Sequence, residues 1–217
     1  MLTQEVRAAI AATWDSLTCN QLIKHLPSYT HHTVAEKWDT GRVPRLKDGS
    51  PRYTPVYGSH GFIRDHLRTL PALSCKTICD AGAGLGFSMY LLGKHLGAER
   101  FEGVELSRDA CTVTNENLKK HKINGRMYNK NILDHDFSKY DLVYSYHPMV
   151  SIDDQFKLDL HILRSMRPGA YYFRLYLAPG LDCIRQADSS LQLKSCLEDP
   201  IDNNHWGNFC ALYQKEV

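Results

Sequence analysis

The sequence predicts an α/β protein with a doubly wound, mainly parallel seven-stranded sheet and an N-terminal helical extension. Two observations carry this prediction. From residue 76 onward, short apolar segments of strand character alternate with longer segments of helical periodicity, and such alternation is typical of parallel sheets with right-handed crossovers. The chain has 217 residues, which is enough for one domain of this kind and a modest extension.

The N-terminal extension begins with a predicted helix over residues 1–26. Its apolar side chains fall on one helical stripe, made by Val6, Ile10, Trp14 and Leu17. Pro27 ends the pattern, and residues 28–52 are polar and contain glycines and prolines, which favours an irregular connector. We interpret residues 1–52 as a helical lid or substrate-selecting extension, and residues 53–217 as the main domain.

The main domain is predicted to begin with a helix over residues 61–70, after which strands and helices alternate. Strands are expected at residues 76–82, 100–106, 125–131, 140–146 and 170–177. Helices are expected between them, at residues 86–97, 108–123 and 153–166. Two late segments, 191–198 and 208–217, are expected to close the sheet as an antiparallel pair.

Composition and charge exclude several classes of function. The 26 basic residues exceed the 24 acidic ones by only two, whereas a general nucleic-acid coat usually needs a basic field. The seven cysteines form no CxxC motif and no Cys/His quartet with zinc spacing, so we expect no metal site and a reducing compartment. The sequence shows neither a signal peptide nor a membrane span. We therefore expect a soluble, cytoplasmic protein.

The most informative motif is the glycine-rich stretch Asp80-Ala81-Gly82-Ala83-Gly84-Leu85-Gly86. It follows a predicted strand and precedes a predicted helix, at the sheet edge where open α/β sheets bind ligands. Glycines there let the backbone approach a ligand closely. The N-terminus of the following helix offers free N–H groups to an anionic group. The pattern thus predicts a ligand site.

The spacing of the glycines distinguishes between possible ligands. The dinucleotide fingerprint G-x-G-x-x-G needs glycine at position 87, which is Phe87, and the G-K-[ST] of a phosphate-binding loop is absent. The observed D-x-G-x-G-x-G resembles motif I of class I, Rossmann-like S-adenosylmethionine-dependent methyltransferases. Later segments with the sequences GVELS, YDLVYSY and RPGAYYF follow in the order found in that family.

The resemblance implies a set of cofactor-binding residues. Glu105 ends the next strand, where an acid can accept both ribose hydroxyls of an adenosine. In the family, a residue at the place of Asn131 bonds the adenine and the following apolar residue packs on its ring. The full set implied for S-adenosyl-L-methionine and its product S-adenosyl-L-homocysteine is Tyr57, Asp80, Gly82, Ala83, Gly84, Gly86, Glu105, Leu106, Asn131, Ile132 and Ser145.

The acceptor is expected to meet the segment after the fourth strand, at residues 145–149. Only Pro148 matches the N-P-P-Y of enzymes that methylate nucleobases or glutamine, so those acceptors are disfavoured. Tyr146 and His147 are the candidate catalytic residues, because His147 can accept a proton near neutral pH and Tyr146 can orient an acceptor.

Three functions stay open at this point. The first is a methyltransferase acting on a protein side chain or a small molecule, with nucleic acid less favoured and no membrane partner. The second is a non-catalytic S-adenosylmethionine-binding module that regulates or scaffolds a partner, because fold alone does not establish turnover. The third, a nicotinamide oxidoreductase, conflicts with the missing last glycine.

Overall fold

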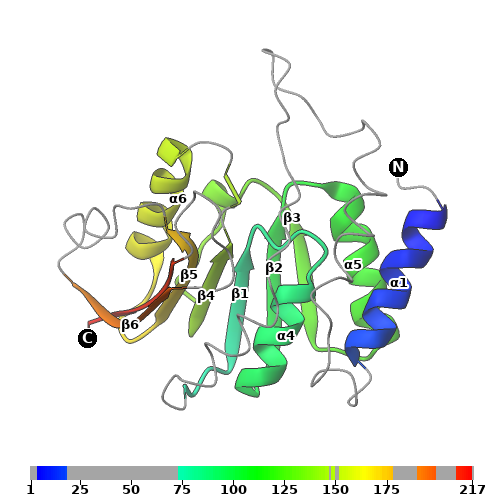
Figure 1. The fold of residues 1–217 in the computed structure, drawn as a ribbon, viewed down its shortest axis with the longest axis horizontal. Coiled ribbons are helices and arrows are strands. Elements are labelled where there is room, and N and C mark those ends of the chain that lie inside the picture. The colour runs from blue at the N-terminus through cyan, green and yellow to red at the C-terminus, as the bar shows by residue number, and fades with distance from the viewer. Residues whose placement is uncertain are drawn as a thin grey trace.

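The computed structural model describes residues 4–18, 73–146, 148–149, 152–177, 190–198 and 209–216. Its seven-stranded sheet has the order β3-β2-β1-β4-β5-β7-β6, and Figure 1 shows it crossing the molecule from β3, near α1, to the C-terminal strands. The strands are β1 (Thr77–Ala81), β2 (Arg100–Glu105), β3 (Gly125–Asn129), β4 (Leu142–Tyr146), β5 (Tyr171–Leu177), β6 (Leu191–Glu198) and β7 (Phe209–Lys215). The predicted doubly wound fold is confirmed.

Helices cover both faces of the sheet, as expected for strands that are buried on both sides. The helical elements are α1 (Gln4–Thr18), α4 (Phe87–Leu96), α5 (Arg108–Lys120), the short 3-10 helix η1 (Ile132–Asp134) and α6 (Ile152–Ser165). Within one strand, Ile78 packs in the core cluster with α1, α4 and α5, and the next residue, Cys79, packs in the cluster with α6. This alternation follows from the two-residue period of a strand.

Local sequence signals mark the end of α4 and the start of α5. Gly97 caps α4 with a left-handed backbone (φ 65°). Ser107 begins α5 by accepting a hydrogen bond from the Ala110 N–H at 3.3 Å, which is the ordinary role of serine at this position. The predicted helix 108–123 is too long by one turn, because Lys122 takes a left-handed conformation (φ 54°) that a helix cannot continue through.

The C-terminal strands close the sheet in the predicted antiparallel manner, with one addition. β7 pairs antiparallel with β6 and also with β5, so it lies between two strands that precede it in the chain. Because β7 is inserted in this way, Tyr213 and Ala211 are buried in the core on the α6 side.

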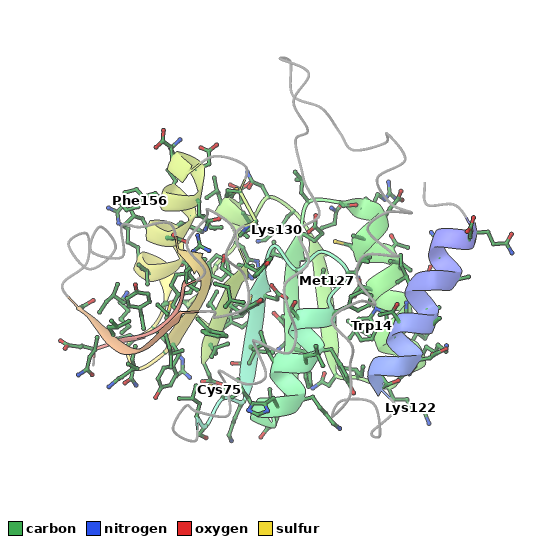
Figure 2. The ribbon with its side chains drawn as sticks, viewed as in Figure 1. Trp14, Cys75, Lys122, Met127, Lys130 and Phe156 are labelled. Carbon is green, nitrogen blue, oxygen red and sulfur yellow. The ribbon has the colours of Figure 1, made fainter. Side chains whose placement is uncertain are left out.

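The N-terminal helix α1 packs on the main domain. Trp14 is fully buried, and its ring centroid lies 5.7 Å from those of both Phe87 and Tyr90 in α4. In Figure 2, Trp14 lies on the side of α1 that faces α4 and α5. Arg7 also pairs with Glu116 of α5 at 3.1 Å. The predicted helix 61–70 and the connector 28–52 lie outside the described residues, so the role of residues 1–52 stays a prediction.

Among the described residues, no helix combines the length and the apolar character needed to cross a bilayer. Three of the cysteines, Cys75, Cys79 and Cys111, are buried free thiols. Burial raises the pKa of Cys75 and of Cys111 to about 12, so these thiols stay protonated at neutral pH.

Candidate functional site

The candidate site lies along the sheet edge where four parallel strands end. β1, β2, β3 and β4 are paired in parallel, so their last residues, Ala81, Glu105, Asn129 and Tyr146, share one edge. In Figure 1 the loop from β1 to α4 runs along this edge. The structure therefore brings the glycine loop and most of the other predicted residues to one place.

The glycine loop leaves β1 in a backbone conformation that favours glycine. Gly82, Gly84 and Gly86 have φ values of 86°, 53° and 73°, all in the left-handed region where a Cβ causes strain. The loop is fixed to the neighbouring strand, because the N–H groups of Gly82 and Ala83 donate to the Val104 carbonyl at 3.0 and 3.1 Å. Its alternating glycines are thus needed for its shape.

The loop is also crowded from the side of β4. A Cβ built on Gly82 would lie 2.2 Å from the Cβ of Pro148, which is far inside van der Waals contact. Pro148 follows β4 by two residues, so the acceptor-side segment rests directly on the loop. The sequence singled out Pro148 only as the remnant of a motif, and its contact with Gly82 was missed because it joins residues far apart in the chain.

Glu105 holds the loop from the end of β2. Its side chain is 2% exposed. Oε2 accepts a hydrogen bond from the Gly84 N–H at 3.0 Å, and Oε1 accepts one from the Ser107 N–H at 2.8 Å. These two bonds fix the orientation of the carboxylate at the edge of the sheet.

Asp80 is a buried acid at the start of the motif. Burial and the neighbouring Glu105 carboxylate raise its pKa well above the usual value, and a hydrogen bond from the Met89 N–H opposes that rise. Its Oδ2 has no hydrogen-bond partner among the described residues. A buried polar atom without a partner is costly, and this one suits a cationic or N–H group supplied by a ligand.

The residues that follow β2 and β3 supply the apolar part of the edge. Leu106 is 50% exposed although it is large and apolar. Asn129, which the sequence did not single out, fixes the backbone there, because its Nδ2 donates to the Leu106 carbonyl at 2.8 Å. The Asn131 Oδ1 caps η1 by accepting from the Leu133 N–H at 3.1 Å, and the adjacent Ile132 is buried against the α6 core cluster.

The structure describes part of the segment that is expected to meet the acceptor, residues 145–149. Tyr146 is partly buried and packs against the cluster that contains α1, α4 and α5. Ser145 is fully buried, in register with Ala81 of β1, so it lies inside the sheet, one residue short of the edge. The remaining two predicted site residues, Tyr57 and His147, lie outside the described residues.

A buried polar cluster, which the sequence analysis did not find, lies behind the acceptor side. It joins α6 to β5 through Gln155, Asp159, Tyr172 and Arg174. Asp159 and Arg174 each lie in a segment of otherwise largely apolar residues, LDLHIL and YYFRLYL, and a charge in such a run is the signal that could have identified the pair.

Comparisons with known proteins agree with this geometry. Residues 78–169 match the model of the methyltransferase domain family. A search of curated proteins finds no match.

Solved structures share the fold at low sequence identity. A methyltransferase from Pyrococcus furiosus has a TM-score of 0.59 at 12% identity, over 86% of this chain and 95% of that one. A putative RNA methyltransferase from Pyrococcus horikoshii has 0.57 at 17%, over 81% and 94%. A geranyl diphosphate methyltransferase, solved with its substrate and sinefungin, has 0.53 at 18%, over 73% and 77%. These solved structures confirm the predicted doubly wound, Rossmann-like fold.

Proposed function

We propose that this chain, whose residues 78–169 match the methyltransferase domain family, transfers the methyl group of S-adenosylmethionine to a protein side chain or a small molecule. The observation that carries the proposal is the joint geometry of the glycine loop and Glu105. A bare, left-handed backbone turn is hydrogen-bonded to a buried carboxylate at the carboxyl edge of a parallel sheet. Both features suit an adenosyl amino acid.

The residues present fit that cofactor. The unpartnered Oδ2 of Asp80 suits its cationic amino group, and the carboxylate of Glu105 at the end of β2 is the group that we propose to accept the ribose hydroxyls. The exposed Leu106 offers an apolar surface to the adenine ring. We propose the remaining members of the set on the family resemblance, namely Tyr57, Gly82, Ala83, Gly84, Gly86, Asn131, Ile132 and Ser145.

The residues of this chain act mainly by positioning the cofactor and the acceptor. When bound, the cofactor would supply an electrophilic methyl group on its sulfonium, for in-line transfer to the acceptor's nucleophile with S-adenosylhomocysteine as the leaving group. Pro148, seated on Gly82, forms the boundary between the loop and the acceptor side. Tyr146 is proposed to orient the acceptor and His147 to take up its proton where the nucleophile arrives protonated. Holding both reactants in line supplies a large part of the rate.

We propose the chemical class of the methyl acceptor. The structural neighbours include a putative RNA methyltransferase and a geranyl diphosphate methyltransferase, so the shared fold serves chemically different acceptors. The nearly balanced charge of this chain, with 26 basic and 24 acidic residues, favours a protein or a small molecule over RNA.

The proposal is tested by measuring formation of S-adenosylhomocysteine. The full chain is incubated with S-adenosylmethionine and, separately, with unfolded proteins, small metabolites and RNA as acceptor pools. Product above the no-acceptor blank in the protein or metabolite pool supports the proposal, and the Gly84→Trp variant is expected to remove it, because its side chain enters the space above the loop. Tight cofactor binding without product in any pool favours the non-catalytic module instead.

A further inference from the structure

Two consecutive residues after β4 are tied to different parts of the molecule. Pro148 lies against Gly82, where a Cβ built on the glycine would come within 2.2 Å of the Pro148 Cβ. The next backbone N–H, that of Met149, donates to Oε1 of Gln155 in the first turns of α6 at 3.3 Å. The segment that separates the glycine loop from the acceptor side is therefore attached to the loop at one residue and to a helix at the next.

Gln155 is itself fixed by a buried ion pair. Its Nε2 donates to Oδ1 of Asp159 at 2.7 Å. The same oxygen accepts from the Tyr172 hydroxyl at 2.6 Å and from Nε of Arg174 at 3.1 Å. All four residues are at most 4% exposed. Charges at such depth persist only when they are paired and hydrogen-bonded, so the cluster holds α6 and β5 in one relative position.

The cluster lies close to the glycine loop within the sheet. Arg174 is in register with Ser145 of β4, and Ser145 is in register with Ala81, the residue before Gly82. On its other side Arg174 is in register with Ala211 of β7. These small neighbours leave room for the Arg174 side chain on the α6 face of the sheet.

We propose that Gln155 is a positioning residue, which ties the segment after β4 to the Asp159–Arg174 pair and so keeps Pro148 seated on the cofactor loop. The position requires a side chain that donates to a carboxylate and accepts from a backbone N–H at the same time. Glutamine does both when neutral. The inference rests on the proposed function, because it gives Gln155 a role at the same cofactor site.

The first test compares Gln155→Met with wild type and with a matched control. Methionine keeps the length of the side chain and removes both hydrogen bonds. We expect it to weaken S-adenosylhomocysteine binding about two- to tenfold, the worth of one neutral hydrogen bond. The control is Lys157→Ala, which removes an exposed ion pair with Asp154 on the same helix and is expected to match wild type. A folded Gln155→Met with unchanged affinity overturns the proposal.

A second variant separates positioning from general loss of stability. A protonated glutamate at position 155 can make both hydrogen bonds. An ionised glutamate repels the Asp159 carboxylate, because Arg174 is already paired with Asp159 and the Tyr172 hydroxyl carries no charge. A like charge raises the pKa of a carboxyl group. Gln155→Glu should therefore bind like wild type at about pH 5.5 and more weakly than wild type at about pH 8.5. A constant ratio to wild type over that range contradicts the proposal.

Amide hydrogen exchange in the absence of ligand distinguishes failure of the proposed function from failure of the positioning role. If the link to the loop is real, the N–H of Gly82 and of Gly84 should exchange faster in Gln155→Met than in wild type or Lys157→Ala. Wild type that binds no S-adenosylhomocysteine overturns the proposed function. Unchanged exchange at the two loop amides overturns the positioning role, whether or not the cofactor binds.

Discussion

Glu105 connects the two halves of the cofactor site through its two oxygens. One oxygen holds the glycine loop at Gly84 and the other holds the start of α5 at Ser107. The carboxylate therefore shapes the site before any ligand arrives, in addition to the ribose contact that we propose for it. Sequence analysis identified Glu105 by its place at a strand end, but it did not find the bonds to the loop.

Replacing Glu105 with alanine is expected to weaken S-adenosylhomocysteine binding by roughly 1.5–3 kcal/mol, the range for hydrogen bonds to a charged group. Isothermal calorimetry measures the loss. Thr112→Ala, an exposed position on α5, serves as the control and should bind like wild type. An unchanged dissociation constant for the Glu105 variant removes this residue from the site.

Asp80 makes the stability of the free protein depend on pH. Burial and Glu105 raise its pKa, so the native state binds this proton more tightly than the unfolded state does. The unfolding free energy therefore falls as the pH rises above about 3.9, the ordinary value for an aspartic acid. Without ligand, Asp80→Asn should be more stable than wild type at neutral pH, by about 1–3 kcal/mol, and should bind S-adenosylhomocysteine more weakly.

Thermal melts of wild type and Asp80→Asn at several pH values check this expectation. The difference between the two midpoints should widen from pH ~4 toward neutrality, because the variant lacks the titrating group. A difference that stays constant over this range shows that the Asp80 carboxyl is not strained in the free protein.

The glycine loop and the segment after β4 are expected to behave as one unit. Gly82→Ala places a Cβ within 2.2 Å of the Pro148 Cβ at a φ of 86°, and it should destabilise the fold by about 1–3 kcal/mol. Pro148→Gly removes the opposing Cβ, so the double variant should recover part of the loss, the part due to the clash. Denaturant unfolding of the four proteins gives the coupling, and strict additivity contradicts the contact.

Most elements could be predicted from sequence because their signals are local. The Gly97 cap, the Ser107 cap and the alternation of strands and helices all lie within a few residues of the structure they specify. The place of β7 between β5 and β6, the seating of Pro148 on Gly82 and the Asp159–Arg174 pair could not be predicted, because each joins segments brought together only by the assembled sheet. The end of α5 was placed too late, because no glycine or proline stands between Lys120 and Gly125 to mark the end of the helix.

The whole molecule depends on α1 as part of its core. Trp14 is fully buried against α4, so Trp14→Ala should reduce the unfolding free energy by about 3–5 kcal/mol. Trp14→Phe keeps much of the packing and should cost less. Equilibrium denaturation measures both, and a loss below about 1 kcal/mol for the alanine variant would mean that α1 does not pack on the domain in solution.

The most direct test of the central claim is calorimetric titration of the full chain with S-adenosylhomocysteine and, in parallel, with NADH. The glycine loop, Asp80 and Glu105 predict binding of one S-adenosylhomocysteine per chain with a dissociation constant below about 100 µM, equivalent to more than about 5.4 kcal/mol, and no comparable binding of NADH. A folded chain that binds NADH tightly, or that ignores S-adenosylhomocysteine at millimolar concentration, would contradict the assignment.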